Sequence, residues 1–140
     1  MNQDFPGKTQ DIAYLLARLL IGMSMFGHGF IRLTKLRTFS EGMIKEFAAS
    51  LLPSWIVIPF SNILPFSEFL CGLLLLIGLF TRFASILGVI LMIILIFGSS
   101  VIEQWNNAFT QIFYGGYFCL LFRYANYNHF ALDHAISKKI

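Results

Sequence analysis

Four polar side chains lie within long apolar stretches of the 140-residue sequence: Arg18, His28, Glu68 and Gln111. Glu68 is followed by an uncharged run over residues 69–80. An ionisable group at the centre of a membrane helix costs about 2.5 kcal/mol or more on insertion scales, so it is a candidate for function. A carboxylate and an imidazole that lie close together can exchange a proton near neutral pH. These residue types therefore suit proton relay, proton-coupled quinone chemistry or the binding of a polar headgroup.

Each of these side chains also has a purely structural interpretation. Glu68 can serve packing alone if it is neutral or hydrogen-bonded to backbone, and Gln111 can join two helices by a hydrogen bond. His28 lies near the end of its apolar stretch and can reach interfacial water. Arg18 can extend to the near interface or face the interior of a helix bundle. A functional site requires several of these side chains to come together.

The composition predicts a membrane protein. Hydrophobic residues make up 57% of the chain and charged residues 12%, whereas soluble domains average about 25% charged residues. The chain therefore has too few charges to cover a water-facing surface. Its net charge of +3 comes from scattered Lys and Arg without a long basic block, so we do not expect nucleic-acid binding. Cys71 and Cys119 lie in apolar runs and form no CxxC pair, and we interpret both as buried apolar side chains.

Four stretches are apolar enough to cross a bilayer, which needs about 20 residues per helix. They are residues 12–31, a stretch that begins between Ser54 and Pro65 and ends at Phe80, residues 83–102, and residues 108–124. For the second stretch we expect a kinked helix from near Ser54 rather than a re-entrant segment before a helix at Pro65. Small residues such as Gly22, Gly29 and Gly72 let membrane helices approach closely. The sequence thus predicts an all-α integral membrane four-helix bundle, with residues 1–140 as a single domain.

The long connection between the first two stretches predicts a short interfacial helix. Thr38 and Glu41 have the spacing of a capping box. Met43, Phe47 and Leu51 then recur at helical spacing, with polar residues between them. We interpret this segment as an amphipathic helix at the membrane interface. The alternative is a lid over the mouth of the bundle.

Four spans put both termini on one side of the membrane. The cations on that side are Lys8, Arg82, Arg123, Lys138 and Lys139. Those on the other side are Arg32, Lys35, Arg37 and Lys45. Because cytoplasmic loops carry the excess of Lys and Arg, both termini are predicted to be cytoplasmic.

The depth of the polar side chains follows from the helical rise of about 1.5 Å per residue. Measured from the terminal side, Arg18 lies roughly 9 Å deep, Glu68 and Gln111 about 20 Å, and His28 about 24 Å. Three side chains from three helices can therefore form one polar site in the half of the bilayer away from the termini. The sequence has no Cys/His cluster with metal-ligand spacing and no phosphate-binding loop. A redox role would thus need an external quinone or a partner subunit that carries the cofactor.

Four segments together resemble the DoxX family of small bacterial membrane proteins. Residues 18–22 and 28–33, RLLIG and HGFIRL, are similar to its RLxxG…HGxxKL signature. Residues 68–82, EFLCGLLLLIGLFTR, resemble its ExxGGxLLLxGLxTR segment, and residues 130–133 resemble its C-terminal SLD. The chain departs from the pattern at Arg32, where the family has Lys, and at Cys71, where it has the first of two glycines. The resemblance implies a four-helix inner-membrane protein, in a family named after a subunit of a thiosulfate:quinone oxidoreductase.

These observations lead to one main functional hypothesis. The chain is expected to be an accessory protein or subunit of quinone-linked redox metabolism in the bacterial inner membrane. Glu68 and His28 would line the site, with Arg18 and Gln111 in support, and no metal is expected. The expected partners are the lipid bilayer, a quinone as the one external cofactor, and a redox partner protein, with a homo-oligomer as a further option. The alternatives are a small transporter or permeability factor and a structural subunit that recruits a soluble partner, and enzymatic activity stays open.

Overall fold

The computed structural model describes residues 6–137, and throughout this range the chain forms helices and short connections without a β-strand. The elements are α1 (Pro6–Thr34), α2 (Leu36–Phe47), α3 (Ser54–Ile77), α4 (Thr81–Val101), α5 (Trp105–Arg123), the 3-10 helix η1 (Ala125–Tyr127) and α6 (Leu132–Ser137). The predicted all-α fold is confirmed. Lys138 and Lys139, which entered the charge count, lie outside the described residues.

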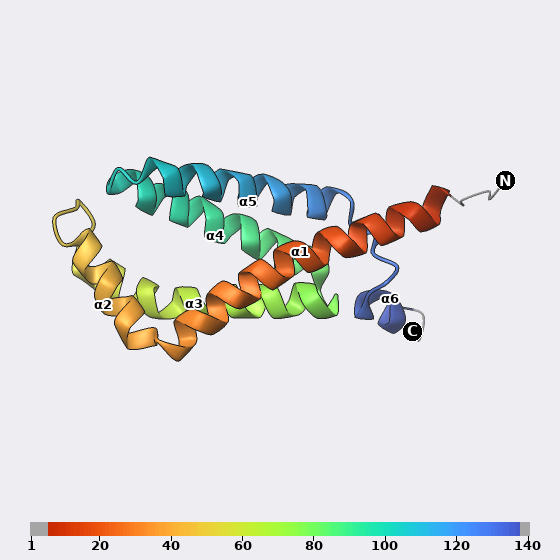
Figure 1. Ribbon diagram of the computed structural model, residues 1–140, viewed down its shortest axis with the longest axis horizontal. Helices are drawn as coiled ribbons and strands as arrows, with labels where there is room; N and C mark the ends of the chain where they lie inside the picture. The colour runs from red at the N-terminus through yellow and green to blue at the C-terminus, as the bar shows by residue number, and fades with distance from the viewer. Residues whose placement is uncertain (1–5, 138–140) are drawn as a thin grey trace.

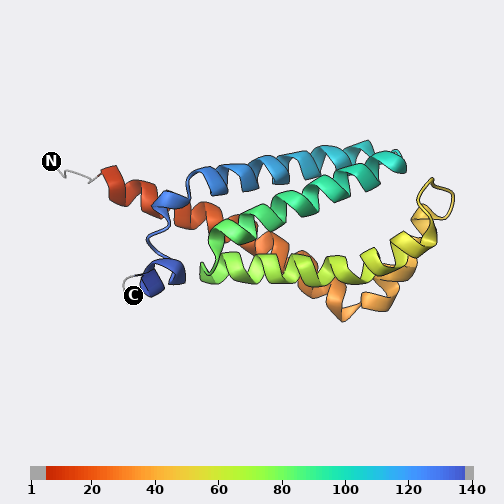
Figure 2. The ribbon, with the colours of Figure 1, turned by 180° about the vertical axis from the view of Figure 1, so that it is seen from behind.

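The long helices form two pairs. Helix α1 packs along α3, and α4 packs along α5. The pairs meet near the short turn between α3 and α4, where α6 and the start of α1 also lie, and they separate towards the end that carries α2 (Figure 1). Seen from behind, α2 folds back against α3 at that far end (Figure 2). The molecule is thus closed at the end of its termini and open at the other.

Three helices are long and apolar enough to cross a membrane: Gly7–Thr34, Ser54–Ile77 and Thr81–Val101. Helix α5 is not among them, because Asn, Gln, Thr and Tyr side chains lower the hydropathy of its 19 residues. The chain is therefore a multi-pass membrane protein by length and composition. The fourth span stays a prediction.

Glycine brings α1 and α3 into close contact, as the small residues predicted. A Cβ atom on Gly29 would lie 2.6 Å from the Cα atom of Phe69, and one on Gly72 would lie 2.6 Å from the Cα atom of Phe26. Neither position has room for a larger residue. Gly27, in contrast, has no atom within 4 Å of such a Cβ. The two backbones approach closely where one of the two helices carries glycine on the shared face.

Helix α3 begins at Ser54 and contains Pro59 and Pro65, so the predicted start near Ser54 is confirmed, whereas the kink stays a prediction. Cys71 faces α4, where its thiol donates to the carbonyl oxygen of Ala84 at 3.3 Å. Its presence beside Gly72 does not disturb the contact with α1, because the two residues point to different neighbours. Cys71 is buried as predicted, but Cys119 is exposed on α5, so the second prediction was wrong. An apolar run in a membrane helix includes residues that face lipid.

The short helix between α1 and α3 exists, but its predicted limits were wrong. It begins at Leu36, and Lys35 at its N-cap makes no side-chain capping bond. Glu41 pairs instead with Arg37, with 2.9 Å between Oε1 and Nε, because the two residues are one helical turn apart. The helix ends at Phe47, so Leu51 lies outside it and is 93% exposed. The hydroxyls of Ser40 and Ser61 lie 2.7 Å apart and fix α2 on α3.

Candidate functional site

A partly buried ion pair joins α1 to α3. Nη1 of Arg32 donates to both carboxylate oxygens of Glu68, at 2.5 Å and 2.6 Å. The Glu68 side chain is 4% exposed and that of Arg32 is 31% exposed. The guanidinium also lies over the ring of Phe39 on α2, with 4.8 Å from Cζ to the ring centroid. Arg32 thus connects three helices at one point.

Arg32 lies one helical turn beyond His28, and the helical rise therefore puts it farther along the membrane normal than Glu68, yet the two side chains meet. Helical side chains lean towards the N-terminus of their own helix. Helices α1 and α3 run in opposite directions, so Arg32 leans towards the middle of the bundle and Glu68 leans towards its far end. The length of the arginine side chain closes the remaining gap. Arg32, counted at first as a loop cation, is therefore part of the site.

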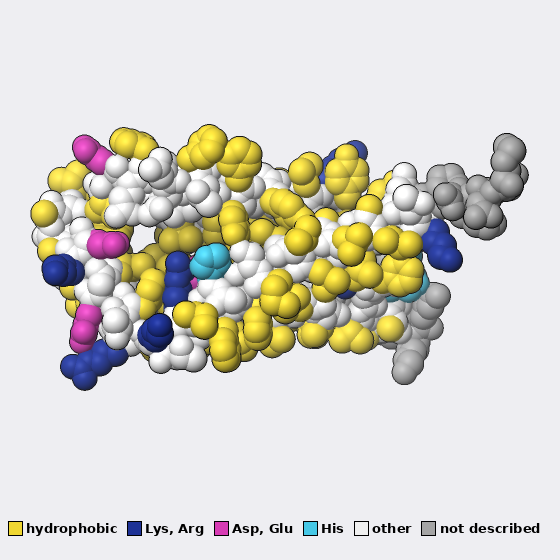
Figure 3. Space-filling view, in the orientation of Figure 1, with side chains coloured by type: hydrophobic (Ala, Val, Ile, Leu, Met, Phe, Trp, Pro, Cys, Tyr) yellow, Lys and Arg dark blue, Asp and Glu magenta, His cyan; other side chains and the backbone are white. Residues whose placement is uncertain are grey.

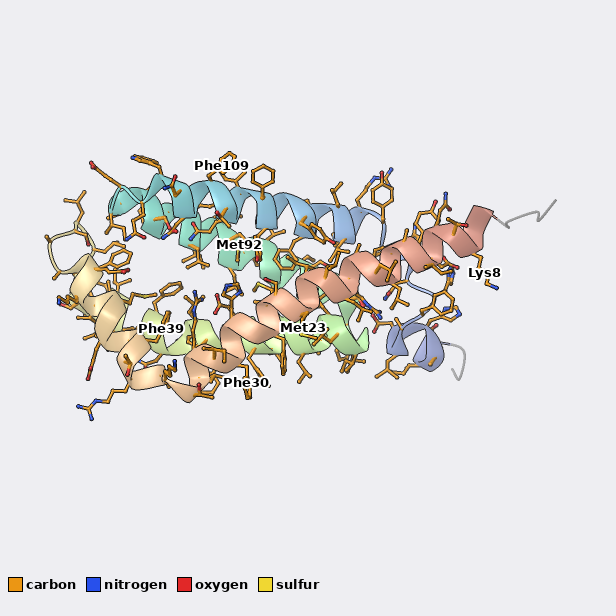
Figure 4. The ribbon with its side chains drawn as sticks, viewed as in Figure 1. Lys8, Met23, Phe30, Phe39, Met92 and Phe109 are labelled. Carbon is orange, nitrogen blue, oxygen red and sulfur yellow. The ribbon has the colours of Figure 1, made fainter. Side chains whose placement is uncertain are left out.

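The ion pair lies in a cavity of about 440 Å³ at the open end of the bundle. Figure 4 shows Phe39 on the α2 side and Met92 on the α4 side of this space, and Figure 3 shows the hollow with basic and histidine side chains at its edge. Helix α2 forms one wall of the cavity, which is consistent with both an interfacial helix and a lid. The other apolar lining residues come from α1 to α4 and include Met25, Met43, Phe47, Phe60, Leu64 and Leu95.

His28 lies in the wall of the same cavity, one helical turn before Arg32. Its Nδ1 lies 2.8 Å from the carbonyl oxygen of Ser24. The Ser24 hydroxyl lies 2.6 Å from the hydroxyl of Tyr114 on α5, and the rings of Tyr114 and His28 meet edge to face at 6.5 Å. The imidazole is therefore held in one orientation while its side chain stays exposed.

Gln111 lies on α5 and lines the cavity from the side opposite α1 and α3. Its Oε1 is buried and has no hydrogen-bond partner among residues 6–137. The expected helix-packing hydrogen bond is therefore not made by this oxygen. An unpaired buried polar atom costs roughly 1–3 kcal/mol, so it calls for a partner such as an ordered water or a ligand. A polar ligand in the cavity would allow the Gln111 amide to rotate and form a hydrogen bond with it.

Arg18 lies at the closed end of the molecule, away from the cavity. It donates to Oδ1 of Asn128 at 2.8 Å and to the carbonyl oxygen of Phe130 at 2.9 Å. The guanidinium is buried, so it faces the interior, as one of the two alternatives required. It binds the segment that follows α5 and takes no part in the polar site. The structure thus brings together His28, Glu68 and Gln111 and separates Arg18 from them.

The same segment closes the end of the bundle through Asp133. Its carboxylate accepts from the backbone N–H groups of Phe80 and Thr81, at 2.7 Å and 2.8 Å. These groups begin α4, where free N–H donors and the helix dipole favour a negative charge. Asn128 also donates to the Thr81 hydroxyl at 2.9 Å. Two of the motif segments, residues 18–22 and 130–133, therefore serve the closed end of the fold.

Three members of the site were not predicted from the sequence: Ser24, Arg32 and Tyr114. Two signals were available for them. Ser24, His28 and Arg32 are four residues apart and share one face of a helix, and Tyr114 follows Gln111 by three residues on α5. The pairing of Arg32 with Glu68 carried no signal of its own, because it depends on the crossing of α1 over α3 (Figure 1). A buried carboxylate nevertheless requires a partner or a proton, and the nearest cation in the adjacent helix was a candidate.

The arrangement suits a small amphipathic molecule. Aromatic and aliphatic side chains share the wall with polar ones: Arg32, His28 and Glu68 form a polar patch on the side of α1 and α3, and Gln111 lies on the opposite side. Small-molecule sites are typically clefts of about 300–1,000 Å³ in which polar groups fix the orientation of the ligand. Both hydrogen bonds of Arg32 to Glu68 come from Nη1, so the guanidinium has further N–H groups for a ligand oxygen.

Comparison with known families identifies one that covers most of this architecture. The family model described as DoxX matches residues 13–100, which is more than half of the chain. The matched region contains the Arg32–Glu68 pair and reaches from α1 almost to the end of α4. Gln111 and Tyr114 lie beyond it. Neither a curated protein nor a solved structure was found to match the chain.

Proposed function

The chain belongs to the DoxX family, and on this basis we propose that it binds the headgroup of a quinone and serves quinone-linked redox metabolism as an accessory protein or subunit. The observation that carries the proposal is the Arg32–Glu68 pair inside a cavity of about 440 Å³ that is lined by both apolar and polar side chains. A quinone has two carbonyl oxygens on an apolar ring with an apolar tail. The polar side chains of the cavity can contact its carbonyl oxygens, and the apolar side chains can contact its ring and tail.

The cavity supports this ligand class on three counts. Arg32 has N–H groups to donate to a carbonyl oxygen, and Glu68 holds the guanidinium in place. The rings of Phe39 and Phe60 line the space and offer flat apolar surface to a quinone ring. Gln111 also lines the space, and the NH2 group of its amide can donate to a quinone carbonyl oxygen. When bound, the quinone would supply the redox chemistry, and the side chains of this chain would bind and orient it.

The proposal includes a place in the cell. We infer that α5 is the fourth span, that the protein resides in the bacterial inner membrane, and that both termini are cytoplasmic. Because Arg32 is paired inside the bundle, it no longer counts as a loop cation at the open end. The cations left at that end are Lys35, Arg37 and Lys45, which strengthens the predicted orientation. A redox partner protein would then bind to this protein and have access to its bound quinone. A homo-oligomer is a further option.

The transport alternative would need a polar path from the cavity to the Arg18 end. The interior between these regions holds Cys71, Leu75 and Phe118, each with an exposed fraction of 0%. This apolar layer favours a binding site that opens at one end of the bundle over a channel. The structural alternative predicts that ligands leave the stability of the protein unchanged. Both alternatives can therefore be separated from the proposal by one binding experiment.

The experiment measures the thermal midpoint of unfolding in mild detergent, with and without a decyl-substituted benzoquinone. A ligand that binds only the folded protein stabilises it, by about 2.7 kcal/mol at 100 times the dissociation constant. We expect the wild type to show a raised midpoint. Glu68→Gln should lose most of the shift, because a neutral amide holds Arg32 less firmly than a carboxylate.

Glu41→Gln is the matched control, because Glu41 is exposed on α2 and pairs with Arg37 outside the cavity. It should keep the full shift. Each variant is compared with its own ligand-free midpoint, so a lower intrinsic stability of Glu68→Gln does not obscure the result. No shift in the wild type at saturating quinone would contradict the proposal. An equal shift in Glu68→Gln would place the ligand elsewhere.

A further inference from the structure

The bond made by one nitrogen of His28 fixes the chemistry of the other. Nδ1 lies 2.8 Å from the carbonyl oxygen of Ser24. A carbonyl oxygen can only accept a hydrogen bond, so Nδ1 carries the hydrogen. In the neutral imidazole, Nε2 then has a lone pair and no hydrogen. In this neutral form Nε2 of His28 is a hydrogen-bond acceptor, on a residue that lines the cavity.

Glu68, the other basic group of the polar patch, is already engaged. Nη1 of Arg32 donates to both of its oxygens, at 2.5 Å and 2.6 Å, and its side chain is almost fully buried. His28 is exposed and lines the cavity. A ligand hydroxyl entering the cavity thus finds its acceptor at His28 more readily than at Glu68.

The two redox forms of a quinone differ in what they offer to this acceptor. The carbonyl oxygen of the quinone has only lone pairs, so its approach to Nε2 brings two acceptors together. The hydroquinone has O–H groups and can donate one of them to Nε2. Arg32 does not distinguish the quinone from the hydroquinone, because its free N–H groups can donate to the oxygen of either form.

We propose that His28 makes the cavity selective for the hydroquinone over the quinone, an inference that rests on the proposed quinone site. The hydroxyl of the ligand donates to Nε2, and Ser24 keeps the imidazole in the required tautomer by accepting from Nδ1. Tyr114 limits the movement of the ring by its edge-to-face contact at 6.5 Å. One neutral hydrogen bond changes a dissociation constant roughly 3- to 10-fold. His28 is thus a specificity-determining residue of the site.

The test compares two dissociation constants for the full chain in lipid nanodiscs. The ligands are a decyl-substituted benzoquinone and its hydroquinone, measured by equilibrium dialysis under anaerobic conditions, with empty nanodiscs to correct for partition into lipid. The wild type should bind the hydroquinone roughly 3- to 10-fold more tightly. His28→Phe should reduce the preference for the hydroquinone, because a phenyl ring preserves the flat shape and has no acceptor nitrogen.

His134→Phe is the matched control, because it makes the same exchange in α6 at the closed end of the bundle. It should keep the wild-type preference. If His28→Phe does not fold, His28→Gln serves in its place, since an amide offers both a donor and an acceptor and should reduce the preference.

The outcomes separate the two proposals. Failure of the wild type to bind either form would overturn the site and its selectivity together. Equal constants, or tighter binding of the quinone, would overturn the selectivity and leave the quinone site standing. A preference for the hydroquinone that persists unchanged in the His28 variants would assign it to another group and would overturn the role of His28.

Discussion

Replacing Gly29 by alanine should destabilise the contact between α1 and α3. The new Cβ would lie 2.6 Å from the Cα of Phe69 and closer still to its backbone nitrogen. Backbone atoms of a packed helix cannot move aside independently, so the helices must separate locally. Extra methyl groups in well-packed interiors cost about 1–3 kcal/mol. Alanine also has a higher helix propensity than glycine, by about 0.8–1.0 kcal/mol in water, and this partly conceals the effect.

Gly27→Ala isolates the packing effect, because Gly27 lies two residues earlier in the same helix and has open space around it. The propensity gain is common to both variants and cancels in their comparison. Gly29→Ala should therefore be less stable than Gly27→Ala by about 1–3 kcal/mol. The assay is reversible unfolding in mixed detergent micelles, followed by circular dichroism. Equal stability of the two variants, or a more stable Gly29→Ala, would refute the close approach of α1 to α3.

Three further predictions concern other parts of the fold. Arg32→Met should lower the unfolding free energy by about 3–5 kcal/mol, because it leaves the Glu68 carboxylate buried without a partner. The double variant Arg32→Met with Glu68→Gln should recover most of this loss in the same unfolding assay. Asp133→Ala should lower the unfolding free energy by about 1–2 kcal/mol, because the first N–H groups of α4 lose their cap, and hydrogen exchange should become faster at Phe80 and Thr81; unchanged exchange there would argue against the cap. A lipid-soluble maleimide should label the exposed Cys119 and spare the buried Cys71 until the protein is denatured, as read by mass spectrometry; early labelling of Cys71 would contradict its burial against Ala84.

Features that depend on one helix at a time could be predicted from the sequence. The helices follow from runs of apolar residues, and α3 begins at Ser54 as expected despite its internal prolines. Glycines at close contacts were found because small residues are the means of helix association in lipid. The capping box at Thr38 failed because the helix begins earlier, at Leu36, where Lys35 makes no side-chain cap. Local spacing does not contain the tertiary contact that holds α2 on α3.

The site shows the same division between local and tertiary information. His28, Glu68 and Gln111 could be placed at one level because the helical rise is constant. Arg32 was assigned to a loop because its contact with Glu68 depends on the crossing of two helices and on the lean of both side chains. Arg18 was grouped with the site because a buried charge in a membrane helix is a candidate for function, yet its partners come from the segment after α5. Sequence spacing along one helix cannot reveal a partner more than one hundred residues away.

The most direct test of the quinone site is to map where a quinone binds. A photoreactive azido-benzoquinone is activated in membranes that contain the protein, and the labelled residues are found by mass spectrometry. The account predicts labels on the cavity methionines, Met25, Met43 and Met92, and their loss when excess unlabelled quinone is present. Met23, exposed on the outer face of α1, is the internal control and should carry only label that unlabelled quinone does not displace. Labels concentrated on Met23 and other outward-facing residues, without competition in the cavity, would contradict a quinone site at Arg32 and Glu68.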